Sequence, residues 1–260
     1  MNERTGFVTQ LGMDYETAFD VAAELEFDFV ELLMDGDHER QRLDPAAVRE
    51  AAADRDLDLL VHLPFALDIG STYEHVREGA IRELVAASET AAEMGAEKGV
   101  AHASSKAWGP AWDDADLREI LLDSVREVDA ETPDEFEVCF ENIPRGAFST
   151  GNFPDLLADT EAAMTLDTGH ARVDGLDSAE MAEFVARHAD RISHFHLNDT
   201  RKAQDEHLPF GSGTIDFEEV LGALPDDWAG TLSLEVFTLE YGYIGVSKEY
   251  LDDVLGRFEK

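Results

Sequence analysis

Short apolar runs alternate with longer amphipathic segments along the whole chain. Eight runs are rich in aliphatic and aromatic side chains, which is typical of buried strands. Residues 74–95 and 246–258 instead repeat apolar positions every three or four residues, which predicts helices. The expected strands cover residues 6–11, 27–34, 57–65, 98–103, 136–142, 162–170, 192–199 and 230–237.

Eight strand–helix units in 260 residues are typical of a (β/α)8 barrel. We expect one TIM-barrel domain of the α/β class over residues 1–260, since no linker, composition break or low-complexity tract divides the chain. A doubly wound open sheet is the alternative. The first expected strand, however, is not followed by the GxGxxG turn of dinucleotide-binding sheets.

The chain is strongly acidic. Its 58 acidic and 20 basic residues give a formal net charge of −38. The regular apolar runs argue against disorder, so these charges are expected on the surface of a folded protein. Salt makes such self-repulsion tolerable, because the Debye length falls to about 3 Å near 1 M. We predict a halophilic host and a fold that requires salt. Full stability after refolding at low ionic strength would contradict this.

Cysteine content and segment hydrophobicity bear on the compartment. Cys139 is the single cysteine of the sequence, so no intramolecular disulfide can form and a reducing interior is expected. The first residues, MNERTGFVTQLGMD, contain no apolar signal core, and no stretch approaches the roughly 20 apolar residues of a transmembrane helix. These features predict a cytoplasmic protein, in a high-salt cytoplasm, with no membrane partner.

Side chains that commonly bind metals gather where the expected strands end. A TIM barrel carries its chemistry at the C-terminal ends of its strands and in the following loops. Strand parity points Glu141 and Glu235 into the barrel, because apolar residues take the alternate positions that face the helices. The candidates are His62, His102, Glu141, Asp167, His170, His196 and Glu235 at six strand ends, with Asp205 and His207 in the loop after the seventh strand.

Carboxylates inside a barrel mouth are costly unless a cation or hydrogen bonds compensate them. Several carboxylates and imidazoles together therefore predict a divalent metal site. A histidine taken alone is more often a core residue, and His194, one layer below His196, is expected to be structural. His38, His75 and His188 fall in loops or on helices and are expected to be exposed.

Together these motifs resemble the xylose-isomerase-like TIM barrels, the superfamily that includes AP endonuclease family 2 (endonuclease IV). Each motif alone is weak, but the ordered set is specific and spans nearly the whole chain. The set comprises HLPF around His62, the strand end at His102, EN at Glu141, LDTGH at 166–170, HLND at 196–199, DEH at 205–207, GSG at 211–213, and Glu235.

The resemblance implies a zinc centre and phosphoester hydrolysis. In endonuclease IV nine side chains hold three zinc ions, and all nine positions look filled here. By this likeness Glu141 would bridge two metals, one completed by His62 and His102. The other would take Asp167, His196 and Glu235, and a third would be held by His170, Asp205 and His207. In that family the metals activate hydroxide and stabilise the phosphate during cleavage. The substrate would be a phosphoester, with damaged DNA among the candidates.

Sugar isomerases and epimerases of the same superfamily imply a second function. They hold one Mn²⁺, Mg²⁺ or Co²⁺ ion on the equivalents of Glu141, Asp167, His196 and Glu235. By resemblance, the two glutamates would act as acid and base at a carbon next to a carbonyl of a small sugar. Glu31 is similar to a residue of many isomerase-like members, and a supporting carboxylate behind the ligands is an equal expectation.

Two departures from endonuclease IV count against a DNA enzyme. Phe65 replaces a tyrosine that helps to hold DNA in that family, and Glu206 replaces an arginine within the third metal site. The nine-ligand set nevertheless favours the hydrolase narrowly over the isomerase. A non-catalytic barrel that keeps metals for stability is a third class, and the sequence leaves the oligomeric state open.

Basic residues in the expected mouth loops favour a phosphate substrate. In such an acidic chain they would form a local positive funnel, although loops are polar in any case. The seven residues are Arg40, Arg42, Lys106, Arg145, Arg172, Arg201 and Lys202, of which the last four are the expected phosphate contacts. Asp216 and Glu219, which follow GSGT, predict a capping box.

Overall fold

The computed structural model describes residues 3–202 and 204–258. Within these ranges, short buried strands alternate with helices from one end of the chain to the other. The strands are β1 (Arg4–Val8), β2 (Phe29–Leu33), β3 (Asp58–His62), β4 (Lys98–His102), β5 (Glu137–Glu141), β6 (Ala163–Asp167), β7 (Ile192–Leu197) and β8 (Thr231–Leu234).

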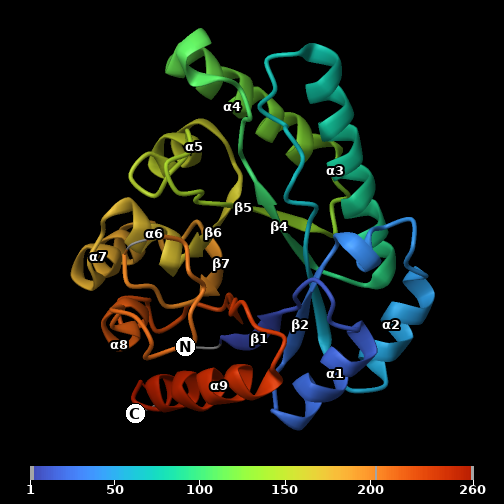
Figure 1. Ribbon diagram of the computed structural model, residues 1–260, viewed down its shortest axis with the longest axis vertical. Coiled ribbons are helices and arrows are strands. Elements are labelled where there is room, and N and C mark those ends of the chain that lie inside the picture. The colour runs from blue at the N-terminus through green and yellow to red at the C-terminus, as the bar shows by residue number, and fades with distance from the viewer. Residues whose placement is uncertain (1–2, 203, 259–260) are drawn as a thin grey trace.

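The strands close into a barrel. Each strand pairs in parallel with its neighbours in sequence, and β1 pairs with β8, so the described strands leave no open edge. Figure 1 shows the helices arranged around this central sheet. The expected (β/α)8 TIM barrel is therefore confirmed, and the open doubly wound sheet is excluded.

Helices cover the barrel and begin mostly at acidic caps. Asp177 forms a complete capping box with Glu180, whereas at Asp216 the structure describes only the bond from the Glu219 amide. No helix in the described residues has the length and hydropathy that a membrane crossing needs. The helices are α1 (Tyr15–Glu24), α2 (Pro45–Ala53), α3 (Glu74–Met94), α4 (Asp114–Glu131), α5 (Phe153–Asp159), α6 (Thr168–Asp174), α7 (Ser178–His188), α8 (Phe217–Leu221) and α9 (Tyr241–Leu255), with 3₁₀ turns η1 (Gly36–His38) and η2 (Gly109–Ala111).

The strand expected over 162–170 ends earlier, at Asp167, and its last residues belong to α6. The Asp167 carboxylate caps this helix by accepting a hydrogen bond from the backbone N–H of His170, at 2.5 Å. Gly169 permits the close packing there, because an added Cβ would lie 1.9 Å from Asn198 Oδ1. His170 therefore reaches the site from a helix rather than from a strand end.

Two other expectations change. The helix expected over 246–258 begins earlier, at Tyr241. Of the three histidines expected at the surface, His75 is exposed and His188 is half-buried, but His38 is buried. His38 packs edge-on against the Tyr15 ring, with centroids 5.9 Å apart, so local apolar packing overrides its position in a connecting segment.

Candidate metal centre

The carboxyl ends of neighbouring strands bring the candidate ligands to one mouth of the barrel. Four strands end on a candidate, and Glu235 follows β8 directly. His196 is the last residue but one of β7. Because parallel strands end at the same rim, these side chains converge although they are far apart in sequence. The four strand-terminal residues are His62, His102, Glu141 and Asp167.

A cavity of about 640 Å³ opens above these strand ends. Asp167 and His196 are fully buried beside its lining residues. The structure thus brings all nine sequence-predicted ligands together, in and around one cavity. The seven that line it directly are His62, His102, Glu141, His170, Asp205, His207 and Glu235.

Three groups whose ligand atoms lie within 4.8 Å of one another cover the nine residues, and a fourth, His62, His196 and Glu235, links the first two. The first is His62, His102 and Glu141; the second is Glu141, Asp167, His196 and Glu235; the third is His170, Asp205 and His207. Glu141 belongs to two groups and uses a different oxygen toward each. Its Oε2 lies 2.7 Å from His102 Nε2, and its Oε1 lies 3.0 Å from His196 Nδ1. This arrangement suits a carboxylate shared between two cations.

The histidines of the groups are oriented by backbone acceptors. A ligating imidazole usually donates its other N–H to an acceptor, which fixes the tautomer. Three rings place Nδ1 beside a backbone carbonyl and turn Nε2 toward the ligand group. These are His62 with Leu63 O (2.9 Å), His170 with Asn142 O (2.9 Å) and His207 with Glu235 O (3.3 Å).

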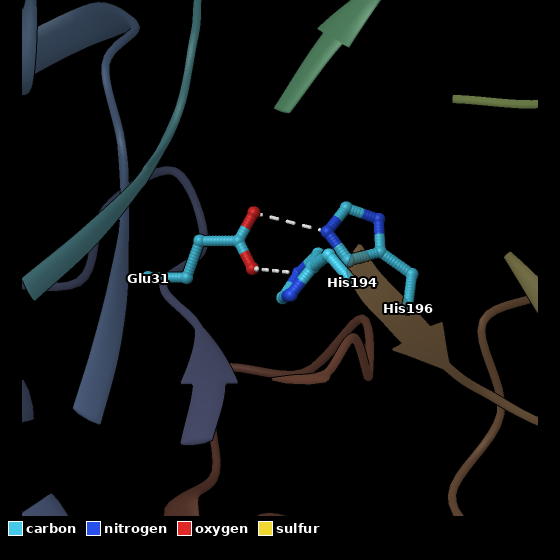
Figure 2. Close-up of side chains that lie close together, drawn as sticks. All are labelled: Glu31, His194 and His196. Carbon is cyan, nitrogen blue, oxygen red and sulfur yellow. Dashed lines mark hydrogen bonds and ion pairs between the residues drawn. The ribbon is translucent and has the colours of Figure 1, made fainter. Parts of the chain in front are cut away.

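His196 and His194, neighbours on one face of β7, differ in their free nitrogens (Figure 2). His196 Nε2 lies 2.9 Å from Glu31 Oε1, which leaves Nδ1 facing Glu141 and Glu235 at 3.0 and 3.1 Å. His194 uses both nitrogens, with Thr231 Oγ1 at 2.6 Å and Glu31 Oε2 at 3.1 Å. His194 therefore has no nitrogen free for the second group, in agreement with the structural role expected for it.

Unpaired buried atoms show that the groups fit a cation. His102 Nε2 and Glu235 Oε2 are buried and have no hydrogen-bond partner in the described parts of the chain. Each nevertheless lies close to another ligand, at 2.7 Å from Glu141 and 3.1 Å from His196 respectively. Buried polar atoms rarely remain unpaired. Nitrogen and carboxylate atoms that converge without hydrogen-bond geometry are the ligand types of divalent metals.

Electrostatics in the second and third groups reflect the density of carboxylates. Burial raises the pKa of Asp167 to about 7, and the charges of Glu141 and Glu235 act in the same direction. Burial lowers the pKa of His170, but Asp167 and Glu141 outweigh it and raise this pKa to about 10. The carboxylates thus hold protons on neighbouring imidazoles. A divalent cation can satisfy the same carboxylates when it displaces those protons.

A braced loop carries Asp205 and His207 to the mouth. Asp199 ties this loop together by accepting backbone hydrogen bonds from Gly213 at 2.7 Å and from Ile215 at 3.1 Å. As a result, Asp205 lies between two histidines, 3.1 Å from His170 Nε2 and 2.8 Å from His207 Nε2. The third group thus depends on one loop and on helix α6.

The xylose isomerase-like TIM barrel family matches residues 19–253. This chain belongs to that family. An uncharacterised protein of Methanocaldococcus jannaschii is 28% identical over 253 residues, which cover 89% of this chain and 83% of that protein. A probable endonuclease 4 of Mycobacterium ulcerans is 28% identical over 196 residues, which cover 71% of this chain and 74% of the relative.

Solved structures similar to this xylose isomerase-like barrel include sugar epimerases and an endonuclease. A D-tagatose 3-epimerase-like protein has a TM-score of 0.85 at 25% identity and covers 98% of this chain and 97% of its own. Endonuclease IV from Thermus thermophilus has a TM-score of 0.75 at 21% identity and covers 98% of this chain and 99% of its own. At this identity the similarity shows the fold alone. The family is enzymatic, and these relatives do not decide between the two activities.

The basic residues expected at the mouth of this xylose isomerase-like barrel lie beside the metal groups rather than among them. In the described residues, the lining of the large cavity includes no lysine or arginine. Arg201 pairs with Glu206 at 2.5 Å, Arg172 donates to Thr214, and Lys202 donates to the Gly175 carbonyl. Arg145 lines a separate cavity of about 460 Å³ between the loops after β4 and β5. Their role in phosphate binding stays a prediction.

Two asparagines in the quoted motifs have roles that the sequence did not assign. Asn142 accepts a hydrogen bond from the Asp167 N–H at 2.7 Å through Oδ1. Asn198 donates to Asp167 Oδ2, also at 2.7 Å. Asn198 thus orients the Asp167 carboxylate, and Asn142 fixes the backbone of the same residue. The motifs EN and HLND contained the signal, but sequence order alone does not show which strand ends face each other.

Apolar walls of the large cavity were also missed. Leu11, Phe237 and Leu239 line it and are more than half exposed. Phe237 stacks on the ring of His207, with centroids 3.8 Å apart and planes 9° from parallel. These residues come from the loops after β1 and β8. No sequence pattern there distinguishes a residue that lines the cavity from any other loop residue. They give the metal groups an apolar rim.

Proposed function

We propose that this barrel is a phosphoester hydrolase of the endonuclease IV kind, with a multinuclear divalent-metal centre. The observation that supports it is the assembly of nine ligand side chains into three groups, with Glu141 shared between two. A single-metal isomerase needs only the second group. The third group, His170, Asp205 and His207, would be superfluous there, yet helix α6 and a loop braced by Asp199 bring it together.

The three groups would hold one divalent ion each, with zinc proposed because five of the nine ligands are histidines. Bound ions would supply Lewis-acid polarisation of a phosphoryl oxygen and would lower the pKa of water. The chain itself contributes orientation. Glu141 offers one oxygen to each of two groups, and Glu235 directs its unpaired Oε2 into the second. The apolar rim borders the cavity in which the reacting groups would lie.

Arg145, Arg172, Arg201 and Lys202 are proposed as contacts to flanking phosphates. Arg145 supports this best, because it forms no ion pair within the described residues and its cavity is lined by the loop that follows Glu141, whereas Arg118 in the same cavity pairs with Asp155. Arg201 would have to exchange its ion pair with Glu206 for a phosphate, so its contribution should be smaller. A duplex containing an abasic site is the natural first substrate, with simpler phosphodiesters as the wider class.

Incision of an abasic-site duplex tests the proposal. The zinc-loaded protein in high salt should cut the strand at the abasic site and leave an undamaged duplex of the same sequence intact. Incubation with ketohexoses under the same conditions is the counter-assay. Epimerisation of a ketohexose without incision of the duplex would refute the hydrolase.

A sugar isomerase or epimerase is the second candidate. The TM-score of 0.85 to a D-tagatose 3-epimerase-like protein, over 98% of the chain, favours it. The second group is complete for one Mn²⁺ or Mg²⁺ ion. In that case Glu141 and Glu235 would exchange a proton with the substrate from opposite sides of the carbon next to the carbonyl.

A further inference from the structure

Glu31, in the middle of β2, holds the two histidines of β7 across the barrel interior (Figure 2). Its Oε1 lies 2.9 Å from His196 Nε2, and its Oε2 lies 3.1 Å from His194 Nε2. All three side chains are fully buried. β2 and β7 are not neighbours in the sheet, since β1 and β8 lie between them. The contact therefore comes from side chains alone.

The direction of each hydrogen bond behind this contact follows from two groups, the ionised Glu31 carboxylate, which can only accept, and Lys98, which can only donate. Lys98 Nζ lies 3.2 Å from Thr231 Oγ1, so the hydroxyl oxygen accepts there. His194 Nε2, 3.1 Å from Glu31 Oε2, must therefore donate. In the neutral ring Nδ1 then accepts from the Thr231 hydroxyl at 2.6 Å, which is the shorter contact of that hydroxyl, since the Ser193 carbonyl lies 3.4 Å away. The Glu31 carboxylate thus accepts a hydrogen bond from His194, a donor whose tautomer is determined.

We propose that Glu31 is a positioning residue, which keeps a proton on Nε2 of His196 and so aims the Nδ1 lone pair at the cation of the second group. An ionised carboxylate can only accept, so the nitrogen that faces Glu31 must donate. On the other side of the ring, Nδ1 faces carboxylate oxygens of Glu141 and Glu235 at 3.0 and 3.1 Å. Those oxygens also only accept, so a proton or a cation has to lie between them and Nδ1.

Among the five candidate ligand histidines, His196 is the one that Glu31 orients. Three others, His62, His170 and His207, are oriented by hydrogen bonds to backbone carbonyls. A carboxylate partner makes an imidazole more basic and a stronger ligand than a carbonyl does. The second group is also the one that both candidate activities require. Glu31 therefore supports the ligand on which the reaction depends most, whichever substrate the protein uses.

The alternative use of the same residues is a further cation between Glu31, His194 and His196, whose ligand atoms lie within 4.8 Å of one another. The Thr231 contact does not conflict with that use, but the hydrogen bonds do not favour it. Both contacts of Glu31 have hydrogen-bond geometry, at 2.9 and 3.1 Å, whereas His102 Nε2 and Glu235 Oε2 of the proposed metal centre have no hydrogen-bond partner in the described residues. Each oxygen of Glu31 accepts one hydrogen bond, from one of the two histidine rings.

Glu31→Gln tests the role, because an amide has the same shape but presents N–H₂ to one of the two rings. If that ring is His196, its tautomer reverses and Nδ1 no longer offers a lone pair. The metal-free wild type and the variant are titrated with Zn²⁺ against a chromophoric chelator in high salt. We expect one ion to bind about 10–100-fold more weakly in the variant and the others to bind unchanged. Asp28→Asn, the matched change at the residue just before β2 begins, should leave all affinities unchanged.

A second measurement needs no variant to fold. In the zinc-loaded wild type labelled with ¹⁵N-histidine, a long-range ¹H–¹⁵N spectrum should show the hydrogen of His196 on Nε2. A hydrogen on Nδ1, equal zinc affinities in wild type and Glu31→Gln, or an additional ion lost with Glu31 would each overturn the inference. The inference rests on the proposed metal centre, but wild-type protein that binds no Zn²⁺ would refute that centre first, before any variant is compared.

Discussion

Glu141→Gln should abolish activity, with a loss on the order of a thousand-fold in kcat/KM under either proposed reaction. Glu141 is buried at the end of β5 and supplies one oxygen to each of two ligand groups. The amide keeps the shape of the side chain but loses the charge that two cations would share. Steady-state kinetics on the abasic-site duplex, together with zinc content after gel filtration, measure both consequences.

Glu137→Gln is the matched control for this change. Glu137 begins the strand that Glu141 ends, and its half-exposed side chain lies at the far end of the barrel, 3.5 Å from Lys98. The same substitution there should leave zinc content and kcat/KM within about two-fold of wild type, because Glu137 belongs to none of the ligand groups. Comparable losses in both variants would show that the effect of Glu141→Gln comes from disturbance of β5.

His207→Ala should separate the two candidate functions. His207 belongs to the third ligand group, 2.8 Å from Asp205, and has no place in the single-metal isomerase. For the hydrolase we expect one zinc ion to be lost and kcat/KM to fall about 100- to 1000-fold. For an isomerase we expect epimerisation of the sugar within about three-fold of wild type.

His75→Ala controls for the removal of an imidazole from the surface, because the His75 side chain is 95% exposed on α3. Removal of His207 also takes a stacking partner from Phe237, so circular dichroism and the thermal midpoint should accompany the kinetics. Unchanged zinc content and unchanged duplex incision in folded His207→Ala would argue that the third group holds no metal.

The fold and the convergence of the candidate ligands were predictable from local patterns. Alternating apolar runs determine eight strands, and a parallel barrel places every strand end at one rim. Depth along β7 distinguished His194 from His196, since the two share one face of the strand and His194 lies one layer deeper. The element that carries His170 was not predictable, because the Asp167 cap that starts α6 depends on the fold around it.

Side-chain contacts across the barrel could not be predicted from the sequence. Glu31 and His196 are far apart in sequence and on strands that do not pair, so nothing local predicts their contact. The rim charge was also misjudged. Three of the basic residues counted toward a positive funnel, Arg40, Arg42 and Arg201, form ion pairs with nearby acidic residues. In a chain with 58 acidic residues, the number of basic residues in the loops overestimates the positive charge that is free to bind phosphate.

Metal stoichiometry tests the central claim most directly. The protein, loaded with zinc in high salt and then dialysed against metal-free buffer of the same salt, is measured by elemental analysis against its protein concentration. Because three ligand groups share nine side chains, we predict about three zinc ions per chain. One exchangeable Mn²⁺ or Mg²⁺ ion per chain, with zinc near zero or one, would contradict the multinuclear hydrolase and leave the single-metal isomerase.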